Sequence, residues 1–149
     1  MKLAEALVLR SDIQKRIKSL QERITKVTIM QKGDKPAEDP QALLGEAHSA
    51  ITNLEGLIFA INSANLNSKT PEGRSITEAL AERDALALKH EFLTKTVDSA
   101  EIPSAYSVRE IRWISTINVE VIQEEIDAIA TRIREVNLEI QEANWLNDI

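Results

Sequence analysis

Residues 119–144, VEVIQEEIDAIATRIREVNLEIQEAN, carry an apolar residue at every third or fourth position. The series has alternating steps of three and four and consists of Val119, Ile122, Ile126, Ile129, Ile133, Val136, Ile140 and Ala143. This spacing places all eight side chains on one side of an α-helix. A helix with so long an aliphatic stripe is not stable alone in water. The stretch therefore predicts a long helix packed on a partner, as in a coiled coil.

The composition of the 149-residue chain favours helices over strands. Aromatic residues make up 3% of the chain, and there are four Gly and four Pro. Few aromatic residues and few helix breakers are typical of proteins built from long helices. The length corresponds to a single domain, residues 1–149. The chain contains no Cys, which excludes disulfides, thiolate metal sites and Cys nucleophiles.

The same periodicity predicts three earlier helices, at about residues 3–31, 40–66 and 75–100. Asp39 and Pro40 are typical of a helix start, and Ser75 with Glu78 forms a capping-box pattern. The first stripe is Leu3, Ala6, Arg10, Ile13, Ile17, Leu20, Ile24 and Val27. The second is Leu44, Ala47, Ile51, Leu54, Ile58 and Ile61. The third helix carries Leu80, Ala81, Ala85, Leu88 and Phe92 on one side, with Leu86, Leu93 and Val97 beside them.

Four helices of similar length joined mostly by short loops predict an all-α, mainly antiparallel bundle. The connection between the last two helices is long enough to cross the bundle, so the direction of the last helix stays open. Within it, residues 108–117 alternate apolar and polar side chains and favour an extended strand. A lone strand leaves its backbone groups unpaired, so it would pair with the same segment of another subunit. The alternative is an extended loop held against the bundle by Trp113.

The second helix is apolar on more than one side. Glu46 and Glu55 are its only charged residues, and apolar side chains also lie outside the stripe. Such a helix needs cover on several sides, which predicts a homo-oligomer, a dimer or larger. The candidate interface residues are Leu43, Ala50, Leu57, Phe59, Ile111 and Trp113. The leading functional hypothesis is therefore a non-enzymatic, self-associating helical scaffold or interaction module.

Charge is distributed unevenly along the chain. Residues 1–32 hold eight Lys/Arg and three acidic residues, whereas residues 103–149 hold four and nine. Opposite charge predicts that the first and last helices are neighbours. An alternative function is nucleic-acid binding through a basic face on the first helix, made of Lys15, Arg16, Lys18, Arg23 and Lys26. The net charge of −6 and the lack of aromatic platforms argue against nucleic acid as a partner.

The sequence contains no clear catalytic or metal-binding motif. Neither His48 nor His90 has a Glu three residues before it, as a di-iron helix would need, so no metal or cofactor is predicted. Arg83, Asp84 and His90 are a candidate polar pocket, which would serve an enzyme with a site between subunits. An ordinary ion-paired surface is the other interpretation.

Two further features concern a buried cation and the location of the protein. Arg10 interrupts the first stripe and either pairs with a carboxylate such as Glu139 or Glu142 of the last helix, or extends to solvent. The apolar start is broken by Glu5 and Arg10, so it does not resemble a secretory signal. We therefore expect a cytoplasmic protein without a membrane span.

Six phrases occur in order along the chain: MKLAEAL (1–7), GDKPAEDP (33–40), LIFAINSANL (57–66), ITEALAERDAL (76–86), REIRWISTINV (109–119) and REVNLEIQEANW (134–145). Together they resemble a family of small, uncharacterised bacterial proteins, some of which carry the name septicolysin. The resemblance spans nearly the whole chain. It implies a cytoplasmic, oligomeric helical protein and assigns no catalytic residue.

Overall fold

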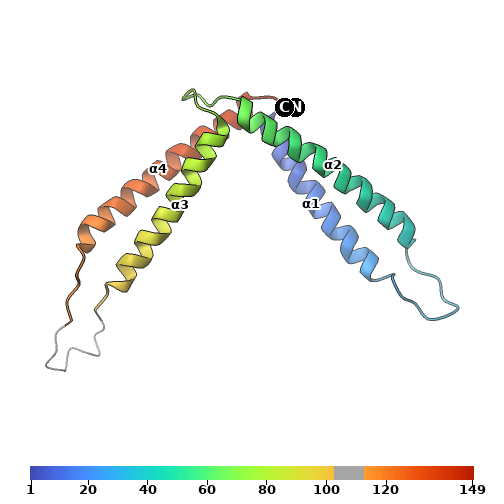
Figure 1. Ribbon diagram of the computed structural model, residues 1–149. Coiled ribbons are helices and arrows are strands. Elements are labelled where there is room, and N and C mark those ends of the chain that lie inside the picture. The colour runs from blue at the N-terminus through green and yellow to red at the C-terminus, as the bar shows by residue number, and fades with distance from the viewer. Residues whose placement is uncertain (103–112) are drawn as a thin grey trace. The chain divides into compact units, whose positions relative to one another are not determined.

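The computed structural model describes residues 1–102 and 113–149 and is built from four long helices (Figure 1). They are α1 (Leu3–Thr25), α2 (Pro40–Asn67), α3 (Ile76–Ser99) and α4 (Val119–Leu146). In these two ranges the chain forms helices, loops and isolated β-bridge residues, such as the pair Lys2 and Asp148, and no β-strand. The predicted all-α fold of four long helices, packed as antiparallel neighbours, is confirmed.

The helix starts follow the predicted capping residues. The backbone N–H of Gln41 donates to the Asp39 carboxylate at 3.0 Å, and Pro40 occupies the first turn of α2. Ser75 and Glu78 form the complete capping box of α3. The Glu78 N–H donates to Ser75 Oγ at 3.2 Å, and the Ser75 N–H donates to the Glu78 carboxylate at 2.7 Å. These side chains satisfy backbone donors that the first turn leaves free.

Helix α1 ends six residues earlier than the sequence predicted. It stops at Thr25, where the N–H groups of Lys26 and Val27 bond the carbonyls three residues earlier. The Thr28 hydroxyl then donates to the Thr25 carbonyl. Ile24, Thr25, Val27, Thr28 and Ile29 form a nearly continuous β-branched run. Such residues lose side-chain freedom in a helix, which favours an early end of α1. The apolar period of the sequence continues past this end, so periodicity alone overestimates the length of the helix.

The described chain divides into two compact units. Unit 1 comprises residues 1–69 and 143–149, and in it α1 and α2 lie side by side as an antiparallel hairpin. The chain ends meet here: the Leu3 N–H donates to the Asn147 carbonyl and the Ile149 N–H to the Met1 carbonyl, both at 3.0 Å. Lys2 Nζ bonds Asp148 at 3.0 Å and the Leu146 carbonyl at 3.1 Å. Both termini of the chain are thereby fixed to unit 1.

Unit 2 comprises residues 70–142 and contains α3 and most of α4. Its core includes Ala79, Val136 and Ile140, with Leu80 and Leu86 packed against them. Ion pairs show the direction of the helices: Glu82 of α3 bonds Arg132 of α4, whereas Lys89, further along α3, bonds Glu125, earlier in α4. The order is reversed, so α3 and α4 are antiparallel.

Each of the two charged helices packs along the helix next to it in the chain, α1 along α2 and α4 along α3. The prediction that the first and last helices are neighbours stays a prediction. Short connections bring sequence neighbours together first. The basic side chains of α1 accordingly find acids nearby in the chain, as Arg16 does with Glu46. The prediction that residues 1–149 form a single domain stays a prediction.

The faces predicted for α2 and α3 also need correction. On α2 the buried residues are Leu43, Ala50, Ile61 and Ala64. With half-buried Ala47, Leu54 and Leu57 they make a complete series of steps of four and three. Leu44, Ile51 and Ile58, which defined the predicted stripe, are exposed. On α3 Leu80 packs as expected, but Leu88 and Phe92 are exposed and Leu86 contacts the core.

The expected extended segment, residues 108–117, lies partly outside the described residues. Ile111 is among those that the structure does not describe. The described part, from Trp113 to Ile117, belongs to no strand, and Asn118 then caps α4 by accepting from the Val121 N–H at 3.2 Å. The pairing of this segment with another subunit stays a prediction.

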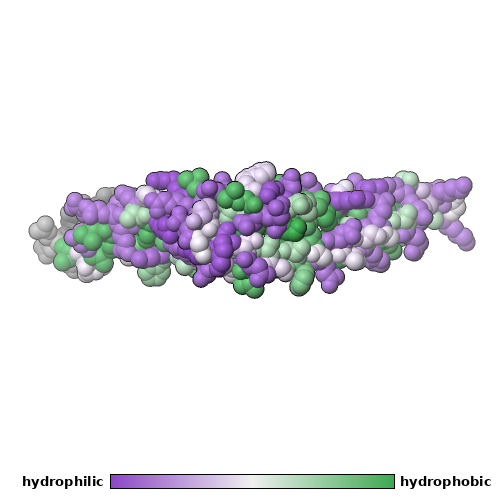
Figure 2. Space-filling view, turned by 90° about the horizontal axis from the view of Figure 1, so that it is seen from above, coloured by the Kyte–Doolittle hydropathy of each residue, from purple (hydrophilic) through white to green (hydrophobic). Residues whose placement is uncertain are grey.

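Large apolar side chains are exposed on several helices. Figure 2 shows such residues in green among polar residues in purple on one face of the molecule. Within the two described ranges, no helix combines the length and the apolar character that crossing a membrane would need.

Candidate functional site

A group of charged side chains joins α3 to α4 within unit 2. We call it the Arg74 cluster, and it consists of Arg74, Glu82, Arg132 and Glu139. Arg74 stands at the end of a tight turn in which the Gly73 N–H donates to the Thr70 carbonyl at 2.9 Å and the Thr70 N–H to the Arg74 carbonyl at 2.8 Å. Gly73 has φ +85°, a conformation that glycine adopts without strain. The turn holds Arg74 immediately before the cap of α3.

Arg74 bonds carboxylates from both helices. Its Nε and Nη2 atoms donate to the two oxygens of Glu139 at 2.8 and 2.6 Å, which is a bidentate pair. Its Nη1 atom bonds Glu82. The Glu139 side chain is 6% exposed. A carboxylate this well buried requires a charged partner, and the planar guanidinium matches its two oxygens.

Glu82 extends the cluster to a second arginine. Arg132 donates from Nε and Nη2 to Glu82 at 2.6 and 3.1 Å, and from Nη1 to Glu135 at 3.3 Å. Glu82 therefore lies between two guanidinium groups. Hydrogen bonds from Arg132 and Arg74 lower the pKa of Glu82 to about 2. The guanidinium of Arg74 likewise lowers the pKa of Glu139, and the two carboxylates raise that of Arg74.

The arrangement is suited to holding the two helices together rather than to acid–base chemistry. A general acid or base needs a pKa near neutral pH, and both carboxylates are shifted in the opposite direction. Arg74 lies in the loop before α3, and its partners come from α3 and from the last third of α4. The cluster therefore fixes the register of α3 against α4.

Glu82→Gln is expected to lower the free energy of unfolding by about 2 kcal/mol at pH 7. The depressed pKa of Glu82 stabilises the folded state above the ordinary value of 4.5, and this contribution disappears as the pH falls through about 2. Urea unfolding of both proteins between pH 7 and pH 2 measures the difference, which should shrink steadily below pH 4.5. A difference that is independent of pH would contradict the assignment.

The three residues of the candidate polar pocket have different surroundings. Arg83 bonds its neighbour Asp84 at 2.8 Å, and the Asp84 side chain is largely exposed. His90 lines a concavity of about 330 Å³ between α3 and α4. The lining consists of His90, Thr94, Val97, Asp98, Gln123, Ile126 and Asp127. Arg83 and Asp84 are not part of that lining, and a catalytic role for the three residues stays a prediction.

The candidate interface residues have different environments. Leu43 and Ala50 are buried within unit 1, on the face of α2 that packs on α1. Leu57 is half-buried on the same face. Phe59 and Trp113 are exposed, and Ile111 lies outside the described residues. Sequence reasoning chose Leu43 and Ala50 because it assigned the packed face of α2 to the neighbouring row.

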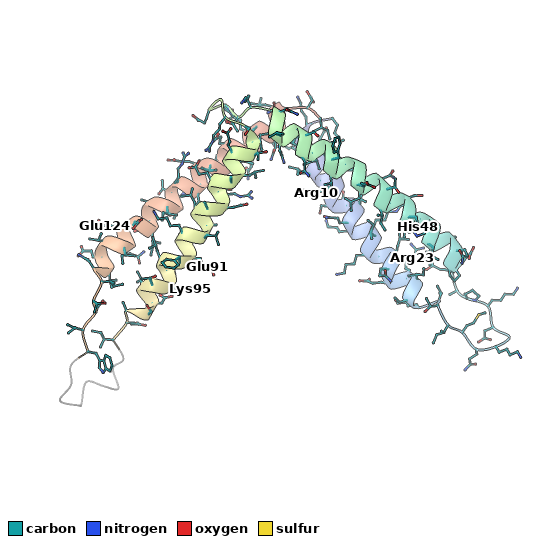
Figure 3. All side chains as sticks on the ribbon, viewed as in Figure 1. Arg10, Arg23, His48, Glu91, Lys95 and Glu124 are labelled. Atoms are coloured by element: carbon teal, nitrogen blue, oxygen red, sulfur yellow. The ribbon has the colours of Figure 1, made fainter. Side chains whose placement is uncertain are left out.

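The basic residues of α1 do not form one uniform face. Arg16 bonds Glu46 at 3.3 Å, and Arg23, which Figure 3 labels on α1, bonds Glu38 through Nε at 3.1 and 3.2 Å. Lys15 lies 3.7 Å from Asp12. The Arg10 side chain is half-buried on α1, but Glu139, one of its expected partners, is held by Arg74 instead. Nucleic-acid binding through α1 stays a prediction.

Comparisons with known proteins place the whole chain in a family. The model of the "Family of unknown function (DUF6847)" matches residues 10–149. A crystal structure of a functionally unknown conserved protein from Corynebacterium diphtheriae is similar, with a TM-score of 0.89 and 32% sequence identity. The match covers 99% of this chain and 97% of that one. No curated protein matches the chain. The chain belongs to the DUF6847 family, whose function is unknown.

Proposed function

We propose that this protein is a self-associating helical protein whose copies dock through a second apolar face on α2. The second face of α2 consists of Leu44, Ile51, Ile58, Phe59 and Leu66. Ile51 is 50% exposed and Phe59 is 74% exposed. The single observation that carries the proposal is that α2 has one apolar face packed on α1 and another that the described residues of its own unit leave exposed.

The energetic argument concerns the area of apolar surface left in water. Fully burying a Leu, Ile or Phe side chain stabilises by about 1.5–3 kcal/mol. Five such residues on one side of a helix form a larger patch than scattered surface side chains do. Glu46 and Glu55 are the only charged residues of α2. Glu46 lies on another side of the helix, so only Glu55, four residues after Ile51 and four before Phe59, would be desolvated by docking. A second copy of the chain supplies an equally apolar surface, as symmetric oligomers require.

The proposal concerns association and assigns no reaction. We further propose that the family includes the bacterial proteins that carry the name septicolysin, supported by the six phrases between residues 1 and 145. A cytoplasmic location likewise stays a prediction.

The proposal predicts a particle larger than 16.7 kDa, the mass of one chain. Replacing both Ile51 and Phe59 with glutamine is expected to raise the dissociation constant about a hundredfold, since about 3 kcal/mol of burial is lost. Sedimentation equilibrium between 0.5 and 50 μM, on the order of typical affinities, measures both proteins. Ser49→Gln, exposed on the same helix and about 80° or more around its axis from every residue of the second face, is the matched control and should associate like the wild type. A wild-type monomer throughout this range would overturn the proposal.

A further inference from the structure

A row of apolar residues runs along the side of α3 that faces away from α4. We call it the α3 row, and it consists of Ala81, Ala85, Leu88 and Phe92, at steps of four, three and four. All four residues are exposed, Leu88 to 68% and Phe92 to 71%. The side of α3 that packs on α4 carries Ala79 and Leu86, roughly half a helical turn away. The row has the spacing of a helix–helix contact and no partner helix within unit 2.

The row is asymmetric in size. Its first two residues are alanines, and its last two are Leu88 and Phe92. A parallel contact between two copies would stack Phe92 on Phe92 and leave a gap between the alanines. An antiparallel contact centred between Ala85 and Leu88 places Phe92 over the partner's Ala81 and Leu88 over the partner's Ala85. Large side chains then meet small ones along the whole contact, as close helix packing requires.

We propose that α3 of one copy pairs with α3 of a second copy in this antiparallel register, about a two-fold axis between Ala85 and Leu88 of the row. The inference rests on the proposed function, that copies associate, and adds a second contact and its geometry. A two-fold axis makes the contact self-complementary, so both alanine halves are covered at once.

The charged residues beside the row are compatible with this register. Asp84 and Glu91 lie along the same edge of the α3 row, and the antiparallel register brings Asp84 near the partner's Glu91. Each carboxylate already has a cation on its own helix: Arg83 bonds Asp84 at 2.8 Å, and Lys95 bonds Glu91 at 2.6 Å. Figure 3 shows Glu91 and Lys95 one turn apart on α3. The two copies therefore meet with their edge charges neutralised locally.

The charge of unit 2 argues against a lipid surface or a nucleic acid as the occupant. Residues 70–142 contain fifteen Asp and Glu against eight Lys and Arg. Anionic membranes and nucleic acids would be repelled by this unit rather than attracted. A second copy has the same net charge, but in the antiparallel register its large residues cover the alanines of the row, so the size match selects it.

Cysteine cross-linking tests the register directly because the chain contains no Cys. Ala81→Cys and Phe92→Cys are prepared separately and also co-expressed, then oxidised and analysed on non-reducing gels. We expect disulfide-linked dimers from the co-expressed pair and none from either variant alone. In the proposed register equivalent positions lie about 16 Å apart along the axis, whereas disulfides need a Cα separation of about 4.4–6.8 Å.

A size exchange supplies the second measurement, which does not depend on disulfide chemistry. Ala81→Phe is expected to raise the dissociation constant at least about tenfold, because it meets the partner's Phe92. The double variant Ala81→Phe with Phe92→Ala restores the size match and should return close to the wild-type value. Ala87→Phe, exposed but outside the row, is the control and should have little effect.

Three outcomes would overturn the inference, and they separate it from the proposed function. Dimers linked through either single variant indicate a parallel contact. The wild type could instead sediment as an oligomer while the co-expressed pair fails to cross-link and the double variant fails to recover. That result contradicts the α3 contact but leaves self-association standing. A monomeric wild-type protein overturns both.

Discussion

Replacing Arg74 with methionine is expected to lower the free energy of unfolding by about 3 kcal/mol. The change leaves the Glu139 carboxylate, 6% exposed, without the bidentate partner that compensates for its burial. It also removes one of the two guanidinium groups that bond Glu82. Urea denaturation at pH 7 followed by circular dichroism gives the free energy of unfolding, with the helical signal confirming the fold.

Two further variants test the cause of this loss. Arg16→Met removes an ion pair with Glu46 whose side chains are both largely exposed, and it should have little effect. The double variant Arg74→Met with Glu139→Met leaves neither Arg74 nor Glu139 charged, so it should recover part of the loss. If Arg74→Met is no more harmful than Arg16→Met, the cluster does not hold α3 and α4 together.

The second large effect is expected on α2. Ile61→Ala should cost about 3 kcal/mol, because Ile61 is 1% exposed and its truncation leaves a cavity in unit 1. Ile51→Ala, ten residues earlier on the same helix and 50% exposed, should cost less than about 1 kcal/mol in the dissociated chain. The comparison is matched because helix, residue type and substitution are the same.

These two variants are best measured by urea unfolding at several protein concentrations. The loss in Ile61→Ala should persist at every concentration, since Ile61 belongs to the core of the single chain. The effect of Ile51→Ala should grow with concentration, because association stabilises the folded chain by mass action. Equal losses at low concentration would show that the packed face of α2 is assigned incorrectly.

The sequence was sufficient to predict where the helices lie because local chemistry determines their limits. Asp39 with Pro40 and Ser75 with Glu78 begin α2 and α3 as expected. The stripes of α1 and α4 were also assigned correctly, because each of these helices has polar residues on its other sides. On α1 the apolar period did not predict the end of the helix at Thr25, where β-branched residues follow one another.

The periodicity of the sequence does not identify the packed faces of α2 and α3. One stripe on α2 passes through Leu44 and Ile51, and another passes through Leu43 and Ala50. The two stripes have the same spacing and are offset along the sequence by one residue. When a helix has two apolar faces, the period cannot decide which one meets its neighbour. Leu88 and Phe92 were assigned to the packed side of α3 for the same reason, although they lie on its exposed side.

The Arg74 cluster was missed because its members are distant in sequence. Arg74 precedes a recognisable capping box, but nothing in the spacing links it to Glu139, 65 residues later. The pairing follows only once α3 and α4 are known to be antiparallel and in register. Glu139 was considered as a partner for Arg10, on the assumption that the first and last helices pack together.

The meeting of the two chain ends has a practical consequence for engineering. Because the Ile149 N–H bonds the Met1 carbonyl, a few added residues would join the ends into a cyclic backbone. The chain could then be opened in the loop between α1 and α2, giving a circular permutant with the same hairpins. Affinity tags and fluorescent labels are accordingly better placed in that loop than at either natural end.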